Sequence, residues 1–169
     1  QVQRKWQYLE SIFIGSEDIR MQLPESAKRF DDIDRSFKKV MTATAKNPTV
    51  LDACLAEGRY DKLVMLSDGL DRVQKSLSDY LDTKRDAFPR FFFISDDELL
   101  SILGSSDPTT VQQHLLKMFA NCARCTFGRG NATATHMTSQ EGGKCKMITP
   151  ATTEGAVEVW LKGEEARDR

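Results

Sequence analysis

Apolar residues recur at helical spacing through the first half of the chain. Residues 3–14 place four of them on one face of a predicted helix: Trp6, Leu9, Ile12 and Phe13. After a polar break, Pro24 suits the first turn of a second helix, which should end before Asn47-Pro48. Its apolar stripe consists of Ala27, Phe30, Ile33, Phe37, Val40 and Met41. A short helix ending at Gly58 is expected next, with Cys54 in its pattern as a buried thiol.

The longest regular pattern runs from Arg59 to near Asp86. Its positions are spaced alternately three and four residues apart: Leu63, Leu66, Leu70, Val73, Leu77, Tyr80 and Lys84. This pattern predicts one helix of about 28 residues, roughly 42 Å long at 1.5 Å per residue. Gly69 inside it costs about 1 kcal/mol relative to alanine. Three heptads do not require a coiled coil, so we predict a long helix packed in an antiparallel bundle.

An aromatic run, FPRFFFIS, follows the long helix. The helix must end before Pro89, and four phenylalanines then fall within six residues. We expect these side chains to bury with Ile94 against several helices, each phenylalanine contributing about 2–3 kcal/mol. The sequence therefore predicts a structural joint formed by Phe88, Pro89, Phe91, Phe92, Phe93 and Ile94.

Two helix starts after the aromatic run carry side chains that can cap them. Ser95 and Glu98 have the spacing of a capping box, and the helix that they open should end at Gly104. Asp107 followed by Pro108 predicts a further start. The buried stripe of this last helix is expected to consist of Val111, Leu115, Met118, Phe119 and Cys122.

The hydrophobic period changes in the last third of the chain. Residues 133–138 and 144–149 can alternate as strands, with Glu141-Gly142-Gly143 turning between them and Pro150 ending the second strand. Helical spacing then returns. The predicted fold is mainly α, an elongated helical bundle with a small β-hairpin inserted near the C-terminal end. We divide it into three parts: a helical bundle over 1–122, a hairpin insertion over 123–150 and the start of a following helix over 151–169.

Composition and charge exclude several classes of function. The chain is 40% hydrophobic and 29% charged, as in ordinary globular proteins. Its 24 basic and 25 acidic residues give no net field that would recruit nucleic acid or an anionic membrane. No stretch approaches the roughly 20 apolar residues of a membrane span. Because an initiator methionine is missing and the last helix has no stop signal, we expect a piece of a longer polypeptide.

The stretch NCARCTFGRGNATATHMTSQEGGKC raises three kinds of chemistry. A zinc site would use Cys122, Cys125, His136 and Cys145, but the second pair is nine residues apart and Cys122 falls on an apolar stripe. A thioredoxin-like dithiol needs its CxxC at a helix N-terminus, whereas this one follows a helix. Gly128-Arg129-Gly130-Asn131 lacks the lysine and the helix of a phosphate loop. We predict a turn there, and no catalytic, cofactor-binding or metal-binding residue.

Four segments together resemble the linker region of dynein heavy chains: WQYLESIF, SLSDYLDTKRDAFPRFFFISDDELLSIL, DPTTVQQHLLKMF and EGAVEVWL. They span almost the whole chain in the family's order, and FPRFFFISDDELL is long and distinctive. The segments GRGN and MTSQEG look more like an axonemal, ciliary dynein than a cytoplasmic one. The cysteines depart from the family's expected hairpin, and we carry no function onto them.

The resemblance implies a non-catalytic mechanical element of a microtubule motor. Such a linker arches over a ring of AAA+ ATPase modules and swings the cargo-binding tail. ATP and Mg²⁺ would bind in the ring, and this piece itself would hold no cofactor. The implied partners are the AAA+ ring of the same heavy chain, microtubules, and dynein intermediate and light chains, with no nucleic acid and no membrane. The implied location is the axoneme of a cilium or flagellum within the cytoskeleton, or the cytoplasm for a cytoplasmic subtype.

Two hypotheses and two alternatives follow. The aromatic run would be a stiff joint between helices, and the hairpin would touch the ring or a neighbouring subdomain through an exposed, adaptable surface. The predicted interaction residues of the hairpin are Thr133, Thr135, Met137, Lys144 and Lys146. A static helical scaffold that binds proteins is the main alternative, because rigid and bistable bundles share the same heptad pattern. A zinc-binding module built on the cysteines is the other.

Overall fold

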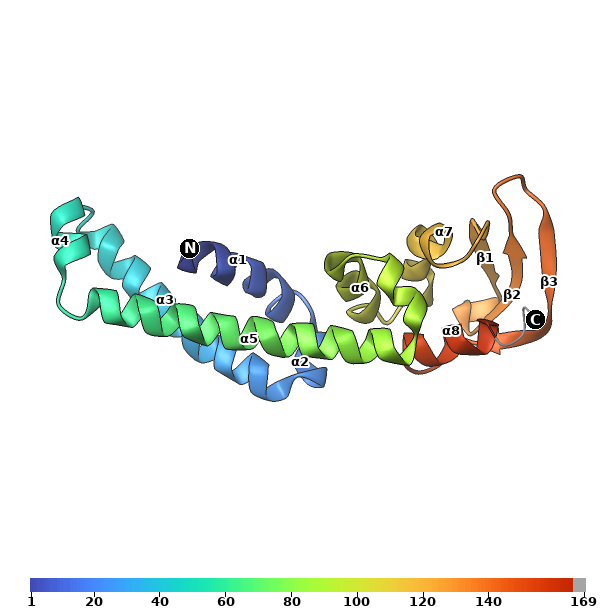
Figure 1. The fold of residues 1–169 in the computed structure, drawn as a ribbon, viewed down its shortest axis with the longest axis horizontal. Coiled ribbons are helices and arrows are strands. Elements are labelled where there is room, and N and C mark those ends of the chain that lie inside the picture. The colour runs from blue at the N-terminus through green and yellow to red at the C-terminus, as the bar shows by residue number, and fades with distance from the viewer. Residues whose placement is uncertain (166–169) are drawn as a thin grey trace. The chain divides into compact units, whose positions relative to one another are not determined.

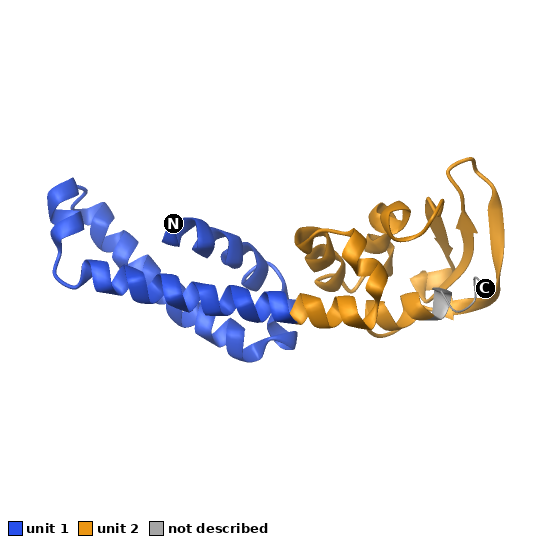
Figure 2. Ribbon diagram, viewed as in Figure 1, with its two compact units in different colours: residues 1–79 blue, residues 80–169 orange. Residues whose placement is uncertain are grey.

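The computed structural model describes residues 1–165 of the chain, and it is mainly helical with one small antiparallel sheet near the C-terminal end (Figure 1). The mainly α fold class is therefore confirmed. The chain divides into two compact units, residues 1–79 and residues 80–169 (Figure 2). Within the described residues, none of the helices combines the length and apolar character that a membrane crossing needs.

The helices of the first unit begin and end where local signals place them. They are α1 (Val2–Phe13), α2 (Glu17–Gln22), α3 (Pro24–Lys46), α4 (Val50–Leu55) and the first part of α5 (Arg59–Ala87). Pro24 opens α3, and α5 runs for 29 residues, so both predicted helices are confirmed. The polar break after α1 is itself helical, because the Ser16 hydroxyl accepts from the Ile19 backbone N–H and caps α2.

The core of the first unit is built from α1, α3 and α5. The Phe13 and Phe30 rings stack with centroids 5.6 Å apart, and Trp6 packs against Phe37 at 5.0 Å. The indole N–H of Trp6 also donates to the Asp34 carboxylate at 2.9 Å. These contacts join the apolar face of α1 to α3, as the spacing of the apolar residues predicts.

Helix α5 buries a stripe that follows the predicted one and then shifts by one residue. Its buried side chains are Leu66, Leu70, Val73, Leu77 and Leu81. Tyr80 is only half-buried. Gly69 has a packing role, because a Cβ atom there would stand 2.8 Å from the Cδ1 atom of Ile33. The missing side chain therefore lets α3 and α5 approach closely at this level.

The short helix α4 departs from expectation in its exposure. Its position matches the prediction, but none of its residues is buried. Val50, Leu51 and Leu55 are each at least 68% exposed, and Cys54 is exposed as well. The expectation of a buried Cys54 is therefore wrong. Met41, at the end of the α3 stripe, is also exposed. In the described residues, no other segment covers these side chains.

The second unit places short helices after the end of α5. The chain forms a 3₁₀ helix over Pro89–Phe93, α6 (Asp96–Leu103), a 3₁₀ helix over Pro108–His114, α7 (Leu115–Met118) and α8 (Val157–Glu165). The capping box is confirmed, since Ser95 and Glu98 exchange side-chain and backbone hydrogen bonds. The stripe expected after Pro108 is buried as well. However, most of that helix is 3₁₀ and not α.

A three-stranded sheet lies between α7 and α8 in the sequence. Its strands are β1 (Arg124–Phe127), β2 (Thr133–Thr138) and β3 (Lys144–Thr152), all antiparallel in the order β1-β2-β3. The two strands of the predicted hairpin are present, whereas β1 was not expected. Pro150 does not end β3 because the strand is at the sheet edge and its register with β2 is interrupted by a bulge, where a missing N–H is tolerated. Residues 166–169 of the last predicted part lie outside the described residues.

The capping box predicts a loss of stability in acid. Hydrogen bonds from Lys117 and from the backbone of Ser95 lower the pKa of Glu98 from 4.5 to about 2. A carboxylate with a depressed pKa stabilises the fold fully above its unfolded value, and this stabilisation is lost as pH falls from 4.5 towards 2. Chemical denaturation at several pH values should therefore show a steeper acid loss in the parent chain than in Glu98→Gln.

The matched control is Asp97→Asn, which removes a carboxylate from the same helical turn but leaves the bonds of Glu98 in place. We expect this control to keep the slope of the parent chain between pH 4.5 and 2. Identical slopes for the parent and Glu98→Gln would contradict the assignment.

Candidate functional site

The predicted joint is a tight reversal of the chain between α5 and α6. The Phe88 N–H closes the last turn of α5 on the Lys84 carbonyl at 3.0 Å. The Phe91 N–H then bonds the Phe88 carbonyl at 3.0 Å, and the Ile94 N–H bonds the Phe91 carbonyl at 3.3 Å. Pro89 occupies the first position of this 3₁₀ segment, where no N–H is needed. The backbone of the joint is thus hydrogen-bonded throughout its turn.

Only half of the phenylalanine rings in the joint are buried. Phe88 and Phe91 are completely buried, with ring centroids 4.9 Å apart in an edge-on arrangement. Phe92 and Phe93 are 63% and 68% exposed, so the expectation that they bury is wrong. The reason is the 3₁₀ period of three residues, which turns Phe88, Phe91 and Ile94 to one side and the other two rings away from it.

Arg90 connects the joint to α7. Its guanidinium donates to the Met118 carbonyl at 2.8 Å and lies 4.8 Å from the centroid of the Phe119 ring. The Phe119 ring also packs against Phe88 at 6.3 Å. The last carbonyls of a helix have no partner within the helix, so Arg90 both satisfies one of them and covers the aromatic cluster.

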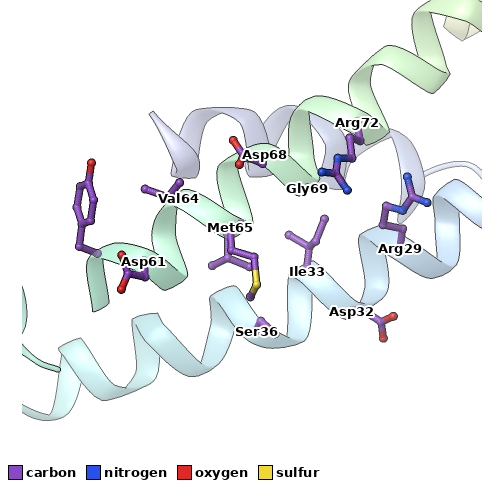
Figure 3. Close-up of a pocket in the computed structure, with 12 residues that line it drawn as sticks. Arg29, Asp32, Ile33, Ser36, Asp61, Val64, Met65, Asp68, Gly69 and Arg72 are labelled. Carbon is purple, nitrogen blue, oxygen red and sulfur yellow. The ribbon is translucent and has the colours of Figure 1, made fainter. Parts of the chain in front are cut away.

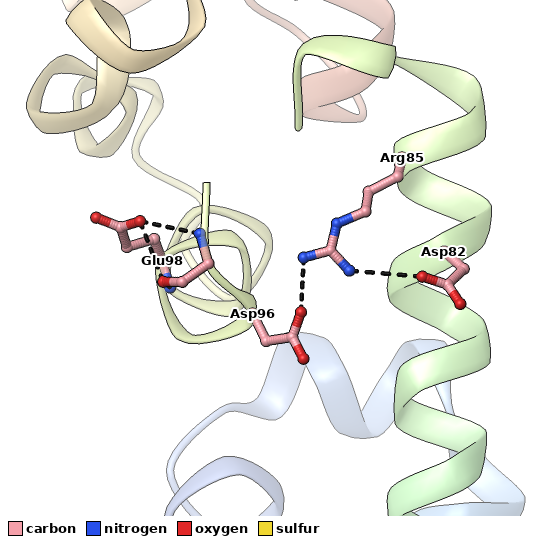
Figure 4. Close-up of polar contacts among 5 residues, drawn as sticks. Asp82, Arg85, Asp96 and Glu98 are labelled. Atoms are coloured by element: carbon pink, nitrogen blue, oxygen red, sulfur yellow. Dashed lines mark hydrogen bonds and ion pairs between the residues drawn. The ribbon is translucent and has the colours of Figure 1, made fainter. Parts of the chain in front are cut away.

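Two ion pairs join the last turns of α5 to other helices. Arg85 donates to the Asp96 carboxylate at 2.6 Å, at the start of α6, and contacts Asp82 at 3.5 Å (Figure 4). Lys84 donates to the Glu158 carboxylate of α8 at 2.5 Å. The Lys84–Glu158 pair is well buried, since the two side chains are only 17% and 10% exposed. The end of α5 is therefore tied separately to α6 and to α8.

Helix α8 also contacts the sheet, through the edge-on packing of Trp160 against Phe127 of β1 at 6.4 Å. The side-chain amide of Gln112 fixes the same strand from another direction. It accepts from the Cys125 N–H at 2.9 Å and donates to the Cys125 carbonyl at 2.5 Å. These contacts join residues far apart in the sequence, and no local signal reveals them.

The predicted interaction residues of the hairpin do not form one surface. Successive side chains of a strand alternate between the two faces, so Met137 lies on the face of β2 opposite to His136 and Thr138. The bulge between Ala134 and His136 interrupts this alternation, so Thr133 and Thr135 do not continue the face of Met137. Lys144 and Lys146 pair with Thr138 and His136 in register, which places both lysines on the face opposite to Met137. Both lysines are exposed, whereas the three β2 residues are half-buried.

The cysteines and His136 do not converge on one point. Cys125 pairs with Met137, which in turn pairs with Cys145, so both thiols lie on one face of the sheet. His136 is the neighbour of Met137 on β2 and lies on the other face. Among the residues that the structure describes, no group of three or more His, Cys, Asp or Glu side chains could hold a metal ion. None of the four cysteines, all of which lie in the described part of the chain, forms a disulfide.

The glycine-rich segment is the turn that the sequence predicts. Residues 129–131 form one 3₁₀ turn between β1 and β2. Gly130 and Asn131 adopt positive φ values of 67° and 59°. A strand, and not a helix, follows this turn, so the phosphate-loop arrangement of strand, loop and helix is not formed.

A groove that was not predicted from the sequence lies in the first unit, between α3 and α5 (Figure 3). Tyr60, Val64 and Met65 contribute to its lining and lie off the buried stripe of α5. Tyr60, Val64 and Met65 are spaced four residues and one residue apart, which places a second apolar strip on α5. This strip was the sequence signal that could have predicted the groove.

Comparison with known proteins identifies relatives over nearly the entire chain. The family model for the dynein heavy chain, N-terminal region 2, matches residues 1–167. The chain is 64% identical to the dynein-1-alpha heavy chain of the flagellar inner arm I1 complex of Chlamydomonas reinhardtii, over 99% of this chain. It is 55% identical to dynein axonemal heavy chain 10 of Homo sapiens, over 95% of this chain.

In both cases the aligned region is 4% of the relative's length. The dynein beta chain of the flagellar outer arm of Chlamydomonas reinhardtii is 45% identical over a similar span. The family model covers almost all of this sequence, so the resemblance inferred from the four sequence segments is confirmed. The chain belongs to the dynein heavy chain family and corresponds to the part described as N-terminal region 2.

Proposed function

We propose that this chain is part of the mechanical linker of an axonemal dynein motor. In this role it transmits the ATP-driven conformational change of an AAA+ ring to the tail, for movement along microtubules. The relatives are named as flagellar, ciliary and axonemal heavy chains, which supports a place in the axoneme of a cilium or flagellum. This chain spans about 4% of their length, so ATP, Mg²⁺, microtubules and the intermediate and light chains belong to the proposal for the whole motor.

The observation that carries the proposal is the way in which the end of α5 is held. A lever transmits force only if its ends do not rotate freely against the parts that they move. The last turn of α5 is fixed by the Phe88 cluster, by the Arg85–Asp96 pair and by the Lys84–Glu158 pair. Because these three contacts reach α6, α7 and α8 separately, bending at this point would break several of them together.

The proposal assigns a mechanical role to these residues and no chemical step. The division at residues 122 and 150 remains a prediction about subdomains of the larger linker. We also propose that the hairpin touches the AAA+ ring or a neighbouring subdomain. The exposed Lys144 and Lys146, together with Ile148 at 93% exposure, support a contact surface on β3.

Phe91→Ala should destabilise the chain by about 3–5 kcal/mol, because a fully buried ring leaves a cavity. Phe92→Ala is the matched control, and its effect should stay within about 0.5 kcal/mol because that ring is exposed. Urea denaturation of the chain measures both values. Equal losses for the two variants would show that the burial pattern of the joint is wrong.

Lys84→Met should cost about 3–5 kcal/mol, because it leaves the Glu158 carboxylate buried without its partner. Replacing both residues with apolar ones of similar size should recover most of the loss, which a double-mutant cycle measures. The exposed Lys75–Asp79 pair on the same helix provides the control, and Lys75→Met should change stability by less than about 1 kcal/mol. A Lys84→Met chain as stable as this control would refute a buried pair.

The lever itself is tested in the complete heavy chain assembled in its motor. Phe91→Ala should lower microtubule gliding velocity more than it lowers ATP turnover, because a softened joint loses the stroke while the ring still cycles. Phe91→Leu keeps most of the buried volume and should restore velocity.

Shortening β2 and β3 by the residues around Gly142 tests the hairpin contact in the same assay. Unchanged gliding and ATPase rates in all variants would reject the proposal.

A further inference from the structure

The groove in the first unit lies between α3 and α5 and has a volume of about 690 Å³ (Figure 3). Ile33 of α3 and Met65 of α5 each point towards the other helix. Ile33 and Leu66 are buried at the base of the groove. By contrast, Val64 is 42% exposed and Met65 is 63% exposed. The groove thus exposes two large apolar side chains of α5, Val64 and Met65, that no other described segment covers.

The groove is on a different side of the α3–α5 pair from α1. Lys5 of α1 bonds Asp71 and Ser67 on α5, and Trp6 bonds Asp34 on α3. None of these contact positions lines the groove. At 100° per residue, Met65, Gly69 and Arg72 point about 100° or more away from Ser67 and Asp71 on α5. Tyr60 and Val64 lie one heptad before Ser67 and Asp71 and share their direction, towards the start of the helix. Helices α1, α3 and α5 therefore form three members of a bundle with one open side.

Charged side chains mark the two ends of the groove. Asp61 lies at one end, and Arg29 and Arg72 lie together at the other (Figure 3). Asp68 stands between them along α5. In the described part of the chain, none of these four groups makes an ion pair, although many neighbouring charges do. The groove therefore has an acidic end at Asp61 and a basic end at Arg29 and Arg72, and Asp32, which pairs with Arg35, also lines it on α3.

The length of the groove determines how long a bound segment can be. Tyr60 and Arg72 stand 12 positions apart on α5, which corresponds to roughly 18 Å at 1.5 Å per residue. About three turns of a second helix have the same length. A small organic molecule fits this lining less well, because specific ligand sites bring polar groups together at one point, whereas here the charges lie apart along the groove.

We propose that the groove holds one amphipathic α-helix of about three turns, supplied by another part of the same heavy chain. This helix runs parallel to α5, with its N-terminus near Asp61 and its C-terminus near Arg29 and Arg72. The partial positive charge of a helix N-terminus and the partial negative charge of its C-terminus match those two ends. Apolar residues spaced three and four apart on the helix cover Val64 and Met65, which completes a four-helix bundle.

The same polypeptide is the source favoured by the size of the relatives. This region is only 4% of their length, so most of a heavy chain is available to supply a helix. A tethered helix also binds at a high effective concentration, which favours it over a free partner. The inference goes beyond the lever function and does not rest on it, because a static scaffold would close the same groove.

The test is photo-crosslinking in the complete heavy chain, assembled in its motor and held without nucleotide. The photoreactive residue p-benzoylphenylalanine replaces Met65 in the groove, and in a control it replaces Lys75, which is 74% exposed on the same helix. We expect a crosslink within the same heavy chain, to residues at helical spacing in one segment outside this region. The Lys75 control should not yield that crosslink.

Charge reversal tests the orientation of the helix. Arg72→Glu should lower the yield of the Met65 crosslink by about tenfold, because it places a carboxylate against the helix C-terminus and removes an attractive charge. Arg4→Glu reverses an exposed charge on α1 that does not line the groove, and it should leave the yield unchanged.

Other results overturn the inference. A crosslink to a second heavy chain or to a different protein contradicts the proposed source. Absence of any crosslink from Met65, with the heavy chain intact, shows that the groove is open to solvent. An unchanged yield in Arg72→Glu contradicts the orientation. None of these readouts depends on ATP turnover or gliding, so failure here is distinguishable from failure of the lever proposal.

Discussion

Burial of the Phe88 ring fixes the point at which α5 ends and the chain reverses. The ring contacts Phe91 and Phe119, while the Phe88 N–H still closes the last helical turn on Lys84. Pro89 follows directly, so the backbone has no means of extending the helix. In this reversed conformation the Phe88 side chain is completely buried. The placement of α6 and α7 beside the end of α5 depends on that burial.

The burial of the charged residues at this junction matters more for the stability of the reversal than their number does. The Arg90 guanidinium covers the Phe119 ring and satisfies a carbonyl at the end of α7. The Lys84–Glu158 pair is shielded from solvent, whereas the Lys75–Asp79 pair on the same helix is open to it. Screening by water weakens the exposed pair, and burial makes the shielded pair costly to break. Two lysine–carboxylate pairs on one helix therefore differ in what their loss costs the fold.

Prolines and glycines made the helix boundaries predictable. Pro24, Pro48 and Pro89 restrict the backbone locally, and α3 and α5 begin and end within a residue or two of the expected positions. The capping box at Ser95 is equally local and was predicted correctly. Strand β1 was missed because its four residues carry too short an alternation. It is held instead by β2 and by the amide of Gln112, which lies 13 residues away.

The sequence by itself determined the positions of the main helices, the strands of the hairpin and the family, since all three depend on local periodicity and on the order of motifs along the chain. Only the tertiary structure decided which phenylalanines of the joint are buried, that His136 lies on the sheet face opposite to Cys125 and Cys145, and that α3 and α5 leave a groove with charged ends. Periodicity fixes which side chains share a face. Which face is covered depends on contacts between segments far apart in the chain.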